Sequence, residues 1–281
     1  MKIKILSAIV AVSIAMGLCP LRAVEATPSE AAALSAPLPT LDTVLKRVAE
    51  QVEKVDENEL MFKRGYSFTR VRKTEYKNSD GEVKKTEEKT KNNNPLTKRV
   101  AVVTKPAGVQ PANGQGSAKE TQANGADKPY ERSDFQIDDD MLGRFDITLV
   151  RREMLNGRPA LVIDFKPTKR KVSEKSIKEK LLNKAAGRVW IDEQESIPAK
   201  ADLHLSAPVS VFGGLVGAVQ KFTYSLNRQR TPEGIWFTVD SDWHLEGREV
   251  FFKRIIDYHE ATTNVIHVPW PQPATVTTVR Q

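Results

Sequence analysis

Cysteine is almost absent from this sequence, because Cys19 is the single one among 281 residues. No disulfide can therefore form within the chain. If the N-terminal segment described below is cleaved after Ala26, the mature protein has no cysteine, which also excludes thiol catalysis and cysteine-ligated metals. An exported protein without disulfides must be held together by its apolar core, which suits one large domain.

The residue patterns of common catalytic sites are also missing. No two of the four histidines, His204, His244, His259 and His267, lie three or four residues apart, as a metal-binding helix would require. The chain has no Gly-x-Ser-x-Gly elbow and no glycine-rich phosphate loop with a lysine. The acidic run 138–140 lacks the spaced ligands of a calcium loop. We therefore expect no enzyme, no metal and no cofactor, and an unrecognised hydrolase is the remaining catalytic alternative.

Extended apolar runs are confined to the N-terminus. Residues 5–18 follow two lysines, are apolar apart from two serines, and are too few to span a bilayer comfortably. Small residues at 24 and 26 suit a signal peptidase, so we predict a signal peptide over 1–26 and a periplasmic protein. An uncleaved anchor helix is one alternative. A lipid anchor on Cys19 is another, disfavoured because Leu18 and Pro20 flank that cysteine.

The chain carries a formal net charge of +7, and its basic residues concentrate in 63–99 and 166–188. A nucleic-acid partner would explain such runs, but export and the lack of interleaved aromatic residues argue against it. Solvated strand faces are the simpler interpretation. Attraction to anionic lipid headgroups, as a transient contact with a membrane surface, is a further option. We expect a monomer.

The hydrophobic pattern divides the chain into a flexible leader (27–37), one domain (38–268) and a proline-rich tail (269–281). An apolar stripe at 3.6-residue spacing predicts a helix over 41–55 that packs on an apolar surface. Residues 172–186 predict a second, charged helix ended by Gly187. The segment 106–129 has almost no large apolar residue, so we expect a flexible insertion there.

Most of the remaining chain alternates apolar and polar residues, as strands do. Turn signals such as Asn78–Gly81 and Asn156-Gly157 separate these segments. The pattern predicts an α+β, mostly β fold. Its core would be a single strongly curved antiparallel sheet of about eleven strands, an incomplete β-barrel, with two or three helices across its concave face.

Twelve large residues are expected to share the apolar face of the sheet and to line a hydrophobic cavity, although they would equally suit a core filled by the helices. They are Phe68, Phe145, Leu149, Ile163, Phe165, Leu203, Phe222, Tyr224, Leu226, Phe237, Trp243 and Phe252. The glycine-containing segment Phe212, Gly213, Gly214 and Leu215 suits a movable lid, or alternatively a buried connection.

Two arginines, Arg70 and Arg72, alternate with the apolar residues of their strand and should lie on the same covered face. An unpaired buried charge is costly, so each needs a partner or a route to water. They would reach water if their strand were at the sheet edge. Alternatively, they lie at the mouth of the cavity and hold an anionic group of a lipid.

Four segments resemble the LolA/LolB-like superfamily of periplasmic lipoprotein-sorting proteins: 66–70 (YSFTR), 156–167 (NGRPALVIDFKP), 186–192 (AGRVWID) and 233–237 (EGIWF). The resemblance spans about 40–265 and implies an incomplete barrel of about eleven strands that encloses a cavity for lipid chains. The Arg-Pro step of the true carrier, whose arginine ties the lid shut, has no counterpart in 91–99, so that arginine cannot be carried over.

These features lead to a first hypothesis of an exported protein that holds a lipid or a lipoprotein acyl chain, as a carrier or receptor in outer-membrane lipoprotein sorting. The alternative is a periplasmic sensory or scaffolding module that binds a protein partner without catalysis and keeps its interior packed.

Overall fold

The structure is a computed structural model, and it describes residues 34–52, 55–96, 139–211, 217–249 and 252–269. The expected signal peptide, the insertion 106–129, the lid residues 212–215 and nearly all of the tail lie outside the described residues. Within those ranges, no helix combines the length and the apolar character that crossing a membrane would require.

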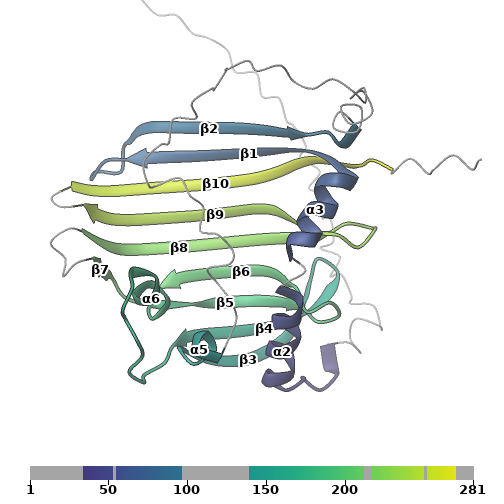
Figure 1. The fold of residues 1–281 in the computed structure, drawn as a ribbon, viewed down its shortest axis with the longest axis horizontal. Helices are drawn as coiled ribbons and strands as arrows, with labels where there is room; N and C mark the ends of the chain where they lie inside the picture. Colours follow the sequence, from purple (N-terminus) through teal and green to yellow (C-terminus); the bar gives the residue numbers. More distant parts are fainter. Residues whose placement is uncertain (1–33, 53–54, 97–138, 212–216, 250–251, 270–281) are drawn as a thin grey trace, which may run out of the picture.

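The described part of the chain forms one antiparallel sheet of ten strands that is not closed into a barrel (Figure 1). The sheet order is β2-β1-β10-β9-β8-β6-β5-β4-β3, and the short β7 pairs with β8. The predicted fold class, mostly β with an open antiparallel sheet, is confirmed. The strands are β1 (Tyr66–Lys77), β2 (Val83–Asn93), β3 (Phe145–Leu155), β4 (Arg158–Pro167), β5 (Ala185–Asp192), β6 (Pro198–Leu205), β7 (Val209–Val211), β8 (Gly217–Arg230), β9 (Trp236–Glu249) and β10 (Phe252–His267).

The helix predicted over 41–55 corresponds to α2 (Leu41–Val52), and a second helix, α3 (Val55–Gly65), follows it. The apolar stripe of α2 packs as expected, with Val44 and Val48 buried against Leu161 and Ile163 of β4. The second helix was not predicted. It inserts Phe62, which is 0% exposed, into an aromatic cluster at the start of β1.

Two short helices complete the described part, α5 (Asp139–Leu142) and α6 (Ile177–Leu182). The expected helix over 172–186 is therefore shorter, with Ser176 capping its start and Asn183 its end. Gly187 does not end it and lies inside β5. A Cβ at Gly187 would lie 2.3 Å from the backbone oxygen of Asp202, so this glycine permits the close approach of β5 and β6.

The helices lie over one face of the sheet, which we call the helix-bearing face (Figure 1). Helices α2 and α3 cover one end of the strands, and α5 and α6 lie toward the other end. None of the described helices crosses the middle of this face. The opposite face is polar over β1, β10, β9 and β8, and has a small apolar cluster around Val162 and Trp190 on β4 and β5.

Candidate functional site

An apolar row crosses the middle of the helix-bearing face at right angles to the strands. The register of the sheet places its members in line, with Gly187 of β5 between the two on β6 and β4. We call this set the aromatic row: Tyr258 on β10, Trp243 on β9, Tyr224 on β8, Leu203 on β6 and Phe165 on β4. The rings of Tyr258 and Trp243 are stacked, with centroids 5.3 Å apart.

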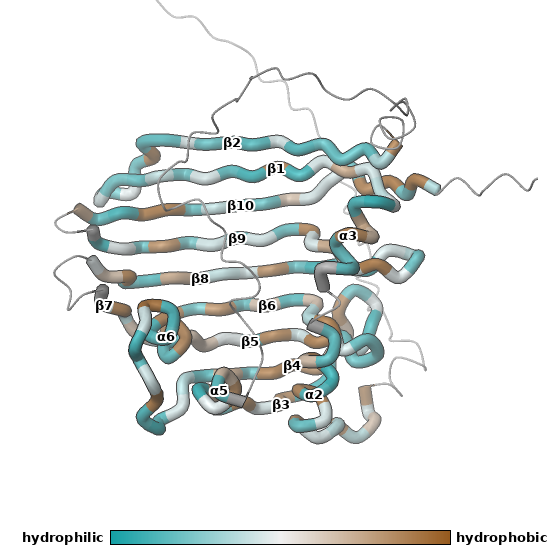
Figure 2. Tube along the Cα trace, viewed as in Figure 1, coloured by the Kyte–Doolittle hydropathy of each residue, from teal (hydrophilic) through white to brown (hydrophobic). Residues whose placement is uncertain are grey.

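Every member of the aromatic row is only half-buried. On an antiparallel sheet with one wet face, that face normally carries polar side chains. Here the middle of the sheet instead presents aromatic and aliphatic side chains, between the two helices at one end and the two at the other (Figure 1). In Figure 2, β1 and β2 are largely hydrophilic, whereas β4 and β5 contain more hydrophobic residues.

The other predicted cavity residues occupy different positions relative to this row. Phe222 and Leu226 flank it on β8 and are also half-buried, whereas Ile163 and Leu149 belong to the core cluster of α2. Phe68 and Phe237 are buried around Phe62, so α3 fills the space above them. Phe145 is buried edge-on against Phe165. Phe252 is 75% exposed at the start of β10, so the structure does not bring it into the row.

Arg70 and Arg72 lie on the helix-bearing face beside the row, as predicted from their alternation. Their strand β1 is not at the sheet edge, because β2 covers it, so the edge-strand explanation is wrong. Arg70 is mostly buried and donates to Glu59 of α3 at 3.1 Å. Arg72 is half-exposed and pairs with Glu260 of β10, a residue that is 8% exposed.

These arginines belong to a charged cluster that also contains Lys63, Glu59 and Glu260. Lys63 pairs with Glu59 at 3.1 Å, and Arg70 also lies 3.6 Å from Glu260. Three cations thus face two carboxylates, which leaves one net positive charge. Burial alone would raise the pKa of Glu59. The positive charges and hydrogen bonds of Arg70 and Lys63 outweigh this effect, so the pKa of Glu59 is lowered.

Tyr258 joins the charged cluster to the aromatic row. Its ring stacks on Trp243, and its hydroxyl donates to Glu260 at 2.9 Å. Burial, together with the charge of Glu260, raises the pKa of Tyr258 to about 12, so it stays a neutral donor. One donor in the cluster is unused, because Nη2 of Arg70 is buried and has no hydrogen-bond partner.

A hollow of about 700 Å³ is lined mainly by charged and histidine residues of the opposite face, from β1, β6, β8, β9 and β10. Its lining also includes Leu203, Tyr224, Trp243 and Tyr258 of the aromatic row. His244 pairs with Asp257 at 2.5 Å, and His259 pairs with Asp242 at 2.6 Å. Among the residues that the structure describes, no group of three or more acidic, histidine or cysteine side chains could hold a metal ion.

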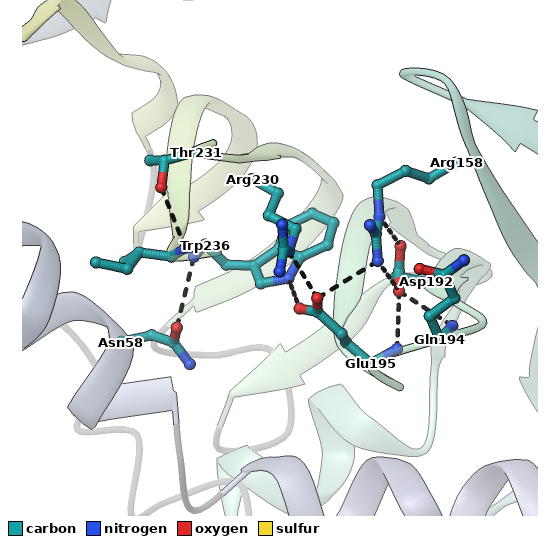
Figure 3. A network of polar contacts seen from close by, with 9 residues as sticks. Asn58, Arg158, Asp192, Gln194, Glu195, Arg230, Thr231 and Trp236 are labelled. Carbon is teal, nitrogen blue, oxygen red and sulfur yellow. Dashed lines mark hydrogen bonds and ion pairs between the residues drawn. The ribbon is translucent and has the colours of Figure 1, made fainter. Parts of the chain in front are cut away.

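Several residues of the segments that carry the family resemblance form a structural clasp at the end of the sheet near α3 (Figure 3). Arg158 at the start of β4 makes two bonds to Asp192 at the end of β5, at 2.6 and 2.9 Å. Glu195 accepts from Arg230 and from the indole nitrogen of Trp236. The clasp therefore joins β4, the β5–β6 turn, β8 and β9, and its charges are satisfied internally.

No family model matches the chain, and no curated protein matches its sequence. Solved structures do match. A LolA superfamily protein from Nitrosomonas europaea has 12% identity and a TM-score of 0.28, over 83% of this chain and 96% of that one. A DUF1329 family protein from Desulfovibrio piger has 14% identity and a TM-score of 0.27, over 80% and 93%. The MucA/MucB complex of Pseudomonas aeruginosa matches at 10% identity with a TM-score of 0.23, over 77% and 94%.

One of these matches is named as a LolA superfamily protein, the family that four segments of the sequence resemble. At these identities and TM-scores the matches carry no argument about this chain, so its function has to be derived from its own side chains. Sequence reasoning missed three residues of the site: Glu59 because α3 was not predicted, and Tyr258 and Glu260 because their contacts join distant strands.

Proposed function

We propose that the chain is an exported, non-catalytic binding protein that holds an acyl chain of a lipid or lipoprotein along the aromatic row, as a carrier or receptor in lipoprotein sorting. The observation that supports this proposal is the half-buried apolar row, which has members on five strands and no described helix above it. Burying such a row under an acyl chain would remove apolar surface from water, at a gain of about 25 cal/mol for each Å².

The charged cluster would give the same ligand an orientation. It adjoins the row at Tyr258, carries one net positive charge, and contains the unsatisfied Nη2 of Arg70. A buried donor without a partner costs about 1–3 kcal/mol, and a phosphate or carboxylate oxygen would relieve that cost. In this proposal the acyl chain lies on the row, and the anionic group of the ligand lies against Arg70 and Arg72.

The test is native mass spectrometry of protein purified from cells, combined with titration of the pure protein with the fluorescent fatty acid cis-parinaric acid. Tyr224→Lys places a charge in the row, whereas Thr223→Lys places the same charge on the neighbouring residue of β8, which faces the other side. Both positions are half-buried, so the two variants are matched. We expect retained lipid and fatty-acid binding in the wild type and in Thr223→Lys, and loss of both in Tyr224→Lys.

Wild-type protein that carries no lipid and does not bind the fatty acid would contradict the proposal. The same result together with a defined protein complex that Tyr224→Lys abolishes would support the alternative, a scaffolding or sensory module whose apolar row docks a protein. Equal loss in both variants would indicate that added charge on β8, and not the row, is responsible.

A further inference from the structure

The loop between β4 and α6, taken together with α6, is the most basic part of the described chain. Residues 166–184 contain eight lysine and arginine residues against two glutamates, a net charge of +6. The loop lies at the end of the sheet near α5 and α6, away from α2, α3 and the clasp (Figure 1). Neither the aromatic row nor the charged cluster uses it.

Buried polar residues hold this self-repelling loop in place. The backbone oxygen of Ser173 accepts from Arg144 Nη1 at 3.0 Å and from Asn183 Nδ2 at 2.8 Å. Arg144 also donates to Asn183 Oδ1 at 2.9 Å, and both residues are 5% exposed. The carboxylate of Glu179 accepts from the Ser173 hydroxyl and from the backbone of Lys175. The loop is therefore ordered by its own supports before any ligand arrives.

A hollow of about 580 Å³ lies within this loop. Its lining includes four cations, Arg170, Lys171, Lys175 and Lys184, and one carboxylate, Glu174. Among the described residues, none of these four cations has a carboxylate within ion-pair distance.

The second basic region of the chain is arranged differently. On β1 and β2, Lys73 pairs with Glu75 and Lys85 pairs with Glu87, at 2.6 and 2.5 Å. Lys77 likewise pairs with Asp257 at 2.5 Å. The loop thus differs from these strands in that its four cations line one hollow and none of them is paired with a carboxylate of the described residues.

We propose that this hollow binds a phosphate group, either the headgroup phosphate of an anionic phospholipid or a soluble phosphate. Several ammonium and guanidinium donors around one concave site suit a multiply charged oxyanion, and arginine can bind it through two parallel hydrogen bonds. The hydroxyl of Thr168 lines the same hollow and adds a neutral donor, whereas that of Ser173 is already used by Glu179. The site is separate from the aromatic row, so it does not depend on the proposed acyl-chain binding.

The experiment compares two double variants that each remove one lysine and one arginine. Arg170→Gln with Lys171→Gln alters the hollow. Lys46→Gln with Arg47→Gln alters exposed residues of α2 at the other end of the sheet. Binding is measured by flotation with phosphatidylcholine vesicles, with and without phosphatidylglycerol, and by titration with inorganic phosphate and pyrophosphate. Thermal unfolding confirms that both variants are folded.

We expect the wild type to bind the anionic vesicles and not the neutral ones, and the loop variant to bind about 30-fold more weakly, at about fivefold per charge. The α2 variant should stay within about twofold of the wild type, because its charges lie toward the other end of the strands from the hollow and salt screens exposed charges with distance. If soluble phosphate displaces the protein from the vesicles, the hollow binds both the lipid headgroup and free phosphate. Vesicle binding that persists in excess phosphate identifies the lipid headgroup as the source.

Binding of phosphate or pyrophosphate without vesicle binding would identify the soluble source, provided that the loop variant loses it. Two results would overturn the proposal: equal weakening of both double variants, which would reflect net charge alone, or no binding of either vesicles or soluble phosphates by the wild type.

Discussion

Two arginine–aspartate pairs with the same geometry but different burial allow the energetics of this sheet to be tested directly. Arg158 contacts Asp192 at 2.6 and 2.9 Å, and Arg188 contacts Asp164 at 2.6 and 2.8 Å. Asp192 is 1% exposed, whereas the side chain of Asp164 is 41% exposed. The two pairs differ mainly in how much water reaches them.

Asp192→Asn should be strongly destabilising. An amide oxygen in place of Oδ1 can still accept from the backbone nitrogens of Gln194 and Glu195, so the β5–β6 turn keeps its bonds. The new amide nitrogen then faces Arg158 Nε, so that two donors oppose each other. The guanidinium also loses its nearer carboxylate and keeps only Glu195, at 3.5 Å. Breaking a buried pair in this way costs about 3–5 kcal/mol. Because Arg158 is 24% exposed, we expect the lower end, about 3 kcal/mol.

The assay is urea unfolding followed by tryptophan fluorescence, since Trp190 and Trp236 lie beside the two pairs. A loss of about 3 kcal/mol should lower the urea midpoint by about 1 M or more. Asp164→Asn removes the same charge from an exposed pair, so its midpoint should remain close to that of the wild type. Equal shifts in the two variants, or a larger shift for Asp164→Asn, would refute the argument that burial decides the contribution of these pairs.

Three further predictions test the packing and the charged cluster. Phe62→Ala should destabilise the protein by about 3–5 kcal/mol in urea unfolding, because Phe62 is fully buried among aromatic rings; a change below about 1 kcal/mol would contradict this. Gly187→Ala should lower the melting temperature more than Gly247→Ala, since the nearest contact of the added Cβ is 2.3 Å in the first case and 3.1 Å in the second. The pKa of Glu59 is lowered, so its ionised form stabilises the fold above pH 4.5 and that stability is lost as the pH falls. The difference in unfolding free energy between wild type and Glu59→Gln should therefore shrink on acidification. A difference that grows instead would contradict the role of Arg70 and Lys63 in stabilising the carboxylate.

Sheet architecture was predictable because it depends on local periodicity. Alternation over 66–76 correctly placed Phe68, Arg70 and Arg72 on one face, and the stripe of α2 identified its buried side. Helix α3 was missed because its pattern is weak: Phe62 is buried, while Leu60 and Met61 are exposed by 45% and 48%. One aromatic ring inserted into a cluster leaves no stripe to detect.

The partners of the arginines could not be predicted, because they depend on contacts between residues far apart in the chain. Glu260 pairs with Arg72, which is 188 positions away in the sequence, because β1 and β10, the first and last strands along the chain, are neighbours in the sheet. The same limitation explains Gly187. In the sequence it follows a charged helical segment and suits a helix end, but its actual role is set by the approach of β6, which local pattern does not reveal.

The distribution of stabilising contacts across the sheet bears on the proposed function. One end is held by the Phe62 cluster, the packing of α2 and the clasp, and the other by Arg144 and Asn183 beneath the basic loop. Between them, the aromatic row is joined to its surroundings mainly by the strands themselves. A sheet secured at both ends can leave apolar side chains half-exposed in the middle without unfolding. That is the arrangement an acyl-chain site requires, because the surface that a ligand is to cover must not already be needed to hold the fold together.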